Sequence, residues 1–339
     1  MSELSARLSL FGFVTRSHRG KNTKLDEINS MIDWVPAEKE IKKHLRRTEN
    51  AVGKPAYPGI VMFKALVLQR MYNLSDHEMA EQLDDRMSFI HFCGFDEIGS
   101  TPDASTICRF RNELLGCGLC EKLFNLILGQ LAKRGTFKAG ISVDATVVES
   151  SRRPRTTLEV IPEDRREPDE PEVTISHSDD TEAAWLKKGK KSSYGYKVHM
   201  AADAETGLVI SGHVTPANKS DMKGLSGVLD RLPEGTEGRC YADKGYASED
   251  NRLLIKKHGL KDGIMSKAAR NKPLTFWERI RNRCISPIRC GIERIFGTFK
   301  RSLGFGRSRY VGQAKVEQEF FIVALAYNLV HGRNLCISY

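Results

Sequence analysis

Three carboxylates stand where the surrounding sequence makes a charge costly. Asp144 lies inside the β-branched run 141–148, where a buried carboxylate needs a hydrogen bond, a cation or a metal. Asp243 directly follows a short apolar run, at the expected carboxyl end of a strand, where open α/β sheets bind ligands. Glu293 is one of only two acids in the basic segment 264–310. Together such acids could hold hard divalent cations, which promote the hydrolysis of phosphodiesters.

Each of these acids also has an ordinary structural interpretation. Asp144 could cap a turn at the end of a sheet, Asp243 could belong to a simple Asp-Lys-Gly turn, and Glu293 could pair with Arg289 on an exposed helix. The apolar neighbours Ile292 and Ile295 favour a partly buried helix instead. Four other acids near strand ends fit turn or cap roles, with Asp221 a candidate to support the site from outside: Asp203, Asp221, Glu249 and Asp250.

The positive charge of the chain is concentrated in one segment. Residues 264–310 hold twelve Lys or Arg and two acids, an excess of ten that equals the net charge of +10. A basic zone of this kind favours a polyanionic partner such as double-stranded DNA, although it could also be a solvated face. The residues expected to contact phosphates are Arg289, Arg294, Lys300 and Arg301, with Arg109 and Arg111 from the region before them.

The composition indicates a soluble, intracellular protein. Of 339 residues, 40% are hydrophobic and 28% charged, and no apolar run approaches the ~18 residues of a membrane span. The first twenty residues lack the pattern of a secretory signal, so we expect a cytoplasmic location. The eight cysteines are interpreted as free thiols. Cys117 and Cys120 have the spacing of a zinc knuckle, but without a second pair we favour buried helix residues.

Short helices are expected in the first 135 residues, which predicts an N-terminal helical domain of the helix-turn-helix type, or a helical domain used only for packing. Ser75 and Glu78 fit a capping box. In the helix after Asp103, we expect Arg109 and Arg111 to lie away from the apolar face. The predicted helices are 25–34, one from 58 to about 72, one from 76, 86–93 and one from 104.

From Gly140 onwards the pattern changes to strands, which predicts an α/β mixed sheet compatible with a ribonuclease-H-like catalytic core over residues 136–310. Residues 150–185 are rich in proline and charge and predict a flexible insertion. Residues 311–339 are expected to form a C-terminal helix on the core. The predicted strands are 141–148, 196–203, 208–214, 238–242 and 263–266; the predicted helices are 248–257, 287–300 and 316–329.

In this order, the motifs of the chain resemble those of DDE transposases of bacterial insertion sequences, most closely insertion-sequence family five, which is related to family four. The matching pieces are Tyr72-Asn73-Leu74-Ser75-Asp76, Pro102-Asp103-Ala104-Ser105-Thr106, Val143-Asp144-Ala145-Thr146, Gly195-Tyr196-Lys197-Val198-His199, Thr215-Pro216-Ala217-Asn218, Ala242-Asp243-Lys244-Gly245-Tyr246, and Arg289 through Glu293 to Lys300. The resemblance covers the chain from about residue 34 to 329.

The resemblance implies a catalytic triad of Asp144, Asp243 and Glu293 that holds two Mg²⁺ or Mn²⁺ ions. Relatives carry a Tyr-x2-Arg-x3-Glu-x6-Lys signature around the glutamate. The arginine, glutamate and lysine are present here, but Ser286 replaces the tyrosine. Trp277, nine residues earlier, is a speculative substitute for its aromatic contact with DNA.

The expected function is therefore that of a DNA transposase. It would bind the terminal inverted repeats of its element, hydrolyse the strands at the ends, and transfer the freed 3′-hydroxyl to target DNA. Pairing two ends implies at least a dimer, with no membrane partner. Two alternatives stay open: a DNA-binding regulator derived from a transposase, and a ribonuclease-H-like nuclease without strand transfer.

Overall fold

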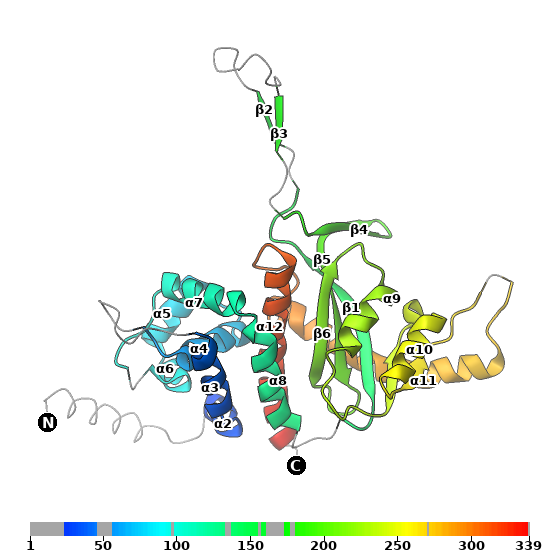
Figure 1. Cartoon of the computed structure of the whole chain (residues 1–339), viewed down its shortest axis with the longest axis horizontal. Coiled ribbons are helices and arrows are strands. Elements are labelled where there is room, and N and C mark those ends of the chain that lie inside the picture. Colours follow the sequence, from blue (N-terminus) through cyan, green and yellow to red (C-terminus); the bar gives the residue numbers. More distant parts are fainter. Residues whose placement is uncertain are drawn as a thin grey trace, which may run out of the picture. The chain divides into compact units, whose positions relative to one another are not determined.

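The computed structural model describes residues 24–45, 56–95, 98–132, 137–154, 157–160, 173–176, 180–269 and 271–337 (Figure 1). The chain divides into two compact units. A helical unit comprises residues 1–135 with 322–339, and a second unit comprises residues 136–321. Within the described ranges, no single helix is both long and apolar enough to cross a membrane.

The helical unit is a set of short helices with polar caps. Ser75 and Glu78 form the predicted capping box, and Asp103 caps the next predicted helix by accepting a hydrogen bond of 2.7 Å from the Thr106 N–H. The helix predicted over 25–34 is confirmed but ends at Met31, and a further helix that was not predicted starts at Val35, where Pro36 suits the first turn. The helices are α2 (Lys24–Met31), α3 (Val35–His44), α4 (Gly59–Met71), α5 (Asp76–Asp85), α6 (Met87–Cys93), α7 (Ala104–Gly116) and α8 (Leu119–Ala132).

The position predicted for Arg111 was wrong. Its side chain is buried, and its guanidinium donates to both carboxylate oxygens of Asp76, at 2.6 and 2.8 Å. Arg111 lies four residues after Ile107, so it falls on the same face of α7 as the apolar residues. Arg111 therefore joins α7 to α5 and does not present its charge to solvent. Arg109 is exposed, as expected.

A mixed sheet forms the centre of the second unit. Strand β1 (Ile141–Glu149) pairs antiparallel with β5 (Lys191–Asp203) and parallel with β7 (Arg239–Ala242). Strand β8 (Lys261–Ile264) continues the sheet parallel to β7. On the other side, β5 pairs antiparallel with β6 (Val209–Pro216) and β4 (Ala184–Lys188). The chain order of the antiparallel strands β1, β5 and β6, followed by the parallel strands β7 and β8, confirms the predicted ribonuclease-H-like class.

Helices cover both faces of this sheet. Along β1, successive side chains alternate between the faces. The face of Ser142 packs against α11 (Phe276–Arg301), where the Ser142 hydroxyl donates to the Ile288 carbonyl at 3.4 Å. On that face of the sheet, Phe320 of α12 (Gln313–Ile337) lies against Gly212. The opposite face packs against α9 (Asp221–Leu229), where the Ser211 hydroxyl donates to the Val228 carbonyl at 2.9 Å.

Two glycines of α9 allow this close packing. A Cβ at Gly224 would lie 2.2 Å from the His199 ring, and one at Gly227 would lie 2.5 Å from the His213 ring. Real Cβ atoms do not approach heavy atoms this closely. The spacing of three residues puts both glycines on the helix face that meets the two rings.

Helix α11 begins well before the predicted start at Pro287. Thr275 and Glu278 form a second capping box, so the helix starts at Phe276 and keeps Pro287 in its interior. The sequence prediction treated the proline as a start signal and overlooked the Thr-x-x-Glu pattern. The helix after the Asp243 turn, α10 (Glu249–Lys257), was predicted correctly apart from its first residue.

The predicted flexible insertion over 150–185 extends too far. Asp180 is buried, and its backbone carbonyl accepts a hydrogen bond of 2.6 Å from the Tyr194 hydroxyl. Its carboxylate also accepts hydrogen bonds from the hydroxyls of Ser150 and Tyr196. Strand β4 starts at Ala184, so the end of the predicted insertion is attached to the sheet through Asp180 and then enters it. Further inside the insertion, β2 (Thr157–Val160) pairs with β3 (Val173–Ser176), and residues 161–172 lie outside the described ranges.

The predicted division at residue 311 also differs from the structure. Helix α12 starts at Gln313, contributes residues up to Phe321 to the sheet unit, and contributes its remaining residues to the helical unit. The helix continues to Ile337, past the predicted end at 329. The C-terminal segment is therefore not a separate third part.

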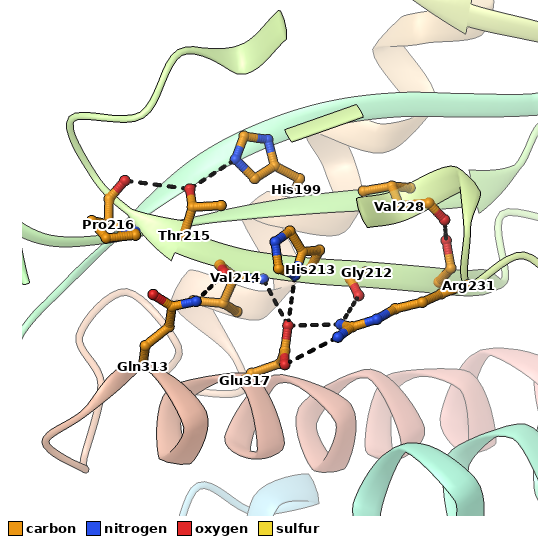
Figure 2. Close-up of polar contacts among 11 residues, drawn as sticks. His199, Gly212, His213, Val214, Thr215, Pro216, Val228, Arg231, Gln313 and Glu317 are labelled. Atoms are coloured by element: carbon orange, nitrogen blue, oxygen red, sulfur yellow. Dashed lines mark hydrogen bonds and ion pairs between the residues drawn. The ribbon is translucent and has the colours of Figure 1, made fainter. Parts of the chain in front are cut away.

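Glu317 attaches the start of α12 to β6 (Figure 2). Its Oε1 accepts from the Val214 N–H at 3.1 Å and from Arg231 Nη1 at 2.7 Å, and lies 2.9 Å from His213 Nδ1. Gln313 Nε2 adds a hydrogen bond of 3.0 Å to the Val214 carbonyl. Burial alone would raise the pKa of Glu317, but these donors hold the pKa down at about 2.

We predict that Glu317→Gln lowers the free energy of unfolding at pH 7 by about 1–3 kcal/mol, because buried charged donors lose their partner. The folded-state pKa lies below the ordinary value of 4.5, so this stability is fully present above that value and is lost as the pH falls through about 2. Urea unfolding of both proteins from pH 7 to pH 2 should show the difference shrink. The exposed Glu234→Gln is the matched control; an equal loss there would contradict the role of Glu317.

We also predict that Gly224→Ala lowers stability by roughly 1–3 kcal/mol, because the new methyl group would collide with the buried His199 ring. Gly129→Ala, in the exposed part of α8 with no neighbouring atom within 4 Å, should be neutral or stabilising by up to about 1 kcal/mol. Thermal unfolding of the two variants provides the comparison. Equal melting temperatures would show that α9 can shift away from the sheet without cost.

Candidate active site

The register of the sheet places Asp144 beside Asp243. Val143 is the partner of Ala242 in the parallel pairing of β1 with β7, and each aspartate is the next residue along its strand. Asp243 keeps extended backbone angles before η3 (Lys244–Tyr246) begins. Neighbouring strands lie about 4.8 Å apart, so two carboxylates from adjacent strands meet at this edge.

Arg289 connects Asp144 to Glu293. Its Nη1 lies 3.0 Å from Asp144 Oδ2, and its Nη2 lies 2.7 Å from Glu293 Oε1. Asp144 reaches α11 because it points to the same face of β1 as Ser142. The side chains of Asp144 and Arg289 are 20% and 17% exposed, whereas that of Glu293 is 51% exposed. The site is thus closed beneath Asp144 and open towards Glu293.

The pKa values of Asp144 and Arg289 are both shifted by the charges of the other acids of the site. Burial raises the pKa of Asp144, and the charges of Asp243 and Glu293 raise it further. The Ala145 N–H, at 2.8 Å from Asp144 Oδ1, and the Arg289 charge act in the opposite direction. Burial would lower the pKa of Arg289, but its hydrogen bond to Glu293 and the three carboxylates raise it. The negative charges of all three acids therefore act on Arg289 and stabilise its charged form.

The donor set suits a hard divalent cation, since carboxylate oxygens are the ligands that Mg²⁺ and Mn²⁺ prefer. In the described part of the chain, no three His, Cys, Asp or Glu side chains are close enough together to hold a metal as they stand. The guanidinium of Arg289 engages one oxygen each of Asp144 and Glu293. A cation at these oxygens would require the Arg289 side chain to move aside.

Two motifs noted in the sequence come together on the α9 face of the sheet. Lys197 is buried; its Nζ donates to the Lys219 carbonyl at 2.6 Å and lies 2.8 Å from Asp221 Oδ1. His199 Nε2 lies 3.1 Å from the hydroxyl of Thr215. Burial lowers the pKa of His199 to about 4, so its ring is neutral at pH 7. These contacts fix the loop that leads from β6 into α9.

Asp221, at the start of that helix, lies next to the turn that carries Asp243. Its Oδ2 is 4.0 Å from the position of a Cβ at Gly245. Burial raises the pKa of the Tyr246 hydroxyl, and the charges of Asp144 and Asp221 raise it further. Asp221 was expected from the sequence to support the site from outside, whereas no function was predicted for Lys197. The signal for Lys197 was the alternation of Lys197 and His199 along an apolar strand.

The other candidate residues fall outside this cluster. Asp203 accepts from the Thr206 N–H and hydroxyl at 2.7 and 2.6 Å in a turn, and Glu249 and Asp250 lie exposed in the first turn of α10. Cys120 is buried as expected, but Cys117 is exposed. Three basic residues predicted to contact DNA are exposed on α11: Arg294, Lys300 and Arg301.

The aromatic side chains at the beginning of α11 are also exposed. Trp277 is 75% and Phe276 is 63% exposed, and their ring centroids are 5.6 Å apart. Ser286, which replaces the tyrosine of the signature, is partly exposed one turn before Arg289. Trp277 lies about 14 Å along the helix from Ser286, at 1.5 Å per residue. The distance argues against a direct substitution of one side chain for the other.

Most of the chain matches known protein families. Residues 135–329 match the family described as "Transposase DDE domain", and residues 13–113 match "Transposase domain (DUF772)". The transposase for insertion sequence element IS1106 of Neisseria meningitidis serogroup B is 38% identical over 232 residues. That alignment spans 67% of this chain and 77% of the relative.

Two solved structures show remote similarity. The piggyBac transposase synaptic complex with hairpin DNA is 13% identical, with 95% of this chain and 77% of that chain covered and a TM-score of 0.45. The pre-cleavage Mos1 transpososome is 9% identical, with 94% and 98% covered and a TM-score of 0.24. Because both TM-scores are below 0.5, these two structures carry no weight, and the family of the chain is assigned from the family matches.

The match of the DDE domain to more than half of the chain agrees with the acids within β1, just after β7 and on α11. The similarity to the IS1106 transposase adds a relative that covers two thirds of the chain. The chain therefore belongs to the DDE transposases, and it is a DNA transposase of the bacterial insertion-sequence type.

Proposed function

We propose that Asp144, Asp243 and Glu293 are the catalytic carboxylates of this transposase and that they hold two Mg²⁺ or Mn²⁺ ions. The observation that carries the proposal is their convergence on Arg289, which bonds to Asp144 and Glu293 while its pKa is raised by all three acids. When bound, the cations would lower the pKa of the attacking water and neutralise the leaving 3′ oxygen.

Arg289 takes part in this proposal as an exchangeable cation. Without DNA, its guanidinium compensates the two carboxylates that it contacts. A phosphate of bound DNA offers the same bidentate geometry, so Arg289 can turn from the acids to the backbone. Arg294, Lys300 and Arg301 continue the exposed basic side of α11 and would position the strand. The movement frees the oxygens of Asp144 and Glu293 for the metal.

The substrates in this proposal are the terminal inverted repeats of the element and a target DNA. Water cleaves the strand at each end and leaves a 3′-hydroxyl, which then attacks a phosphodiester of the target and releases its 3′ oxygen. Pairing of two ends requires at least two protomers on DNA. We further propose that the element belongs to insertion-sequence family five and that the enzyme acts on DNA in the bacterial cytoplasm.

We predict that Asp144→Asn, Asp243→Asn and Glu293→Gln each reduce metal-dependent cleavage of end-containing DNA by at least about 10³-fold, because each removes a ligand charge. Their binding of the same DNA in EDTA should stay within a few-fold of the wild type. Glu249→Gln, at an exposed acid of α10, is the control and should cleave normally.

Cleavage by all three variants at the wild-type rate would refute the assignment of the triad. Retardation of DNA without cleavage by the wild type, in either metal, would instead support a regulator. Nicking without joining of a pre-cut end to a plasmid would support a nuclease.

We propose that Lys197 positions Asp221 against the Asp243 turn. Lys197→Met should raise the Mn²⁺ concentration for half-maximal cleavage by about 10- to 100-fold, as loss of groups that orient metal ligands does. Lys197→Arg should restore part of this loss. The exposed Lys219→Met, whose backbone carbonyl remains available, is the matched control. A fall in rate with an unchanged metal requirement would show that Lys197 serves only the stability of the fold.

A further inference from the structure

The β4–β5 hairpin carries a lysine cluster that the segment 264–310 does not include. Four of the five residues from Lys187 to Lys191 are lysines, and all four are exposed. Gly189, with φ of +62°, stands first in the two-residue turn, as type II′ hairpins prefer. This tight turn makes Lys188 and Lys191 cross-strand partners. Like charges directly opposite each other destabilise a hairpin, so the pair is costly without an anionic partner.

Further cations gather beside this hairpin from distant parts of the chain. Glu149, at the end of β1, lies 3.7 Å from Lys191 Nζ and 3.2 Å from Arg153 Nη2. The Glu149 N–H donates to the Gly306 carbonyl at 3.0 Å, and the position of a Cβ at Gly306 is 3.7 Å from the Lys300 side chain. Lys300 of α11 thus lies next to the hairpin.

Negative charge in this cluster is scarce. Among the residues described by the structure, every ion pair of the cluster uses Glu149. Arg307 is exposed and donates to the Ser150 and Ser151 carbonyls at 3.2 and 2.7 Å, which leaves its charge uncompensated by an acid there. Burial lowers the pKa of Lys300, and the charges of Lys191 and Lys188 lower it further. The cluster therefore has a surplus of positive charge.

The hairpin is fixed to the sheet. The Tyr194 hydroxyl donates to the Asp180 carbonyl at 2.6 Å, and the Gln313 N–H donates to Glu182 Oε2 at 2.5 Å. At the other end, a Cβ at Gly195 would lie 2.2 Å from the Val148 carbonyl oxygen, so β5 packs tightly on β1. Figure 1 shows β4 beside the first part of β5. The backbone that carries the lysines is held in place, so its ordering costs little entropy on binding.

We propose that this hairpin cluster, Lys187, Lys188, Lys190, Lys191, Arg153, Lys300 and Arg307, binds the phosphate backbone of the DNA that enters the active site. The inference rests on the proposed function, since it takes DNA as the partner. Glu149 is five residues from Asp144 on β1, or about 16 Å at 3.3 Å per residue. A duplex along β1 would therefore meet the cluster about five base pairs from the cleaved phosphate, at 3.4 Å per pair.

The test measures the salt dependence of DNA binding by the full chain in EDTA, where no cleavage occurs. The probe is a labelled duplex of about 30 base pairs, and the slope of log K against log [KCl] counts the phosphate contacts. The double variant Lys188→Gln/Lys191→Gln should make the slope less negative by roughly 2 and weaken binding at 0.1 M salt by about 10- to 100-fold. Lys256→Gln/Lys257→Gln, exposed in the last turn of α10, is the charge-matched control and should change neither.

An unchanged slope in the hairpin variant, or an equal change in the control, would overturn the proposal.

A second readout uses the fluorescence of Trp185, which is 52% exposed on β4. With Trp277→Phe, Trp185 is the exposed tryptophan that remains, because Trp34 is buried. Duplex DNA should change its emission, and the two hairpin substitutions should abolish that change. Binding is measured without metal, so the result is independent of the triad. Wild-type cleavage by all three carboxylate variants would refute the proposed triad and leave this test intact.

Discussion

The pairing of two carboxylates with one guanidinium is the interaction on which the site depends. A carboxylate such as Asp144 at the centre of a sheet is costly unless a cation or hydrogen bonds accompany it. The Ala145 N–H and Arg289 supply both. Arg289 also bonds to Glu293 on its own helix, so one side chain links the acid of β1 to the acid of α11. Asp144 and Glu293 are thereby held close together by a single side chain.

The opposite face of the sheet serves the same site by different means. There, Lys197 and Asp221 form a pair beneath the turn that carries Asp243. Close approach of α9 makes this possible, and that approach depends on glycines at the two positions that meet His199 and His213. Because Gly224 and Gly227 have no side chains, α9 can pack close enough to the sheet to bring Asp221 to this position. Close packing on one face and paired charges on the other thus support the same place, where β7 ends beside the middle of β1.

The distribution of positive charge reflects the path that a polyanion would take over the sheet unit. The basic side of α11 ends at Lys300, and the lysine hairpin begins beside that residue. Between them, Glu149 is the acid that pairs with the cluster in the described part of the chain. Phosphate groups are a suitable counterion for such a surface, since binding releases condensed cations from DNA.

Local sequence determined the elements and the identity of the acids. The β-branched run around Asp144, the Ala-Asp-Lys-Gly turn and the capping box at Ser75 are governed by neighbouring residues, and the structure has the corresponding strands and helices. The start of α11 could also have been predicted from neighbouring residues, Thr275 and Glu278.

Tertiary structure decided the rest, because the contacts concerned join residues far apart in the chain. Arg111 is buried by its pairing with Asp76, Lys197 acquires a role through Asp221, and the lysine hairpin meets Lys300 through the strand pairing of β1, β4 and β5. A charge count along the sequence balances the hairpin against acids elsewhere, whereas charges in a folded protein act through space and fall off with distance.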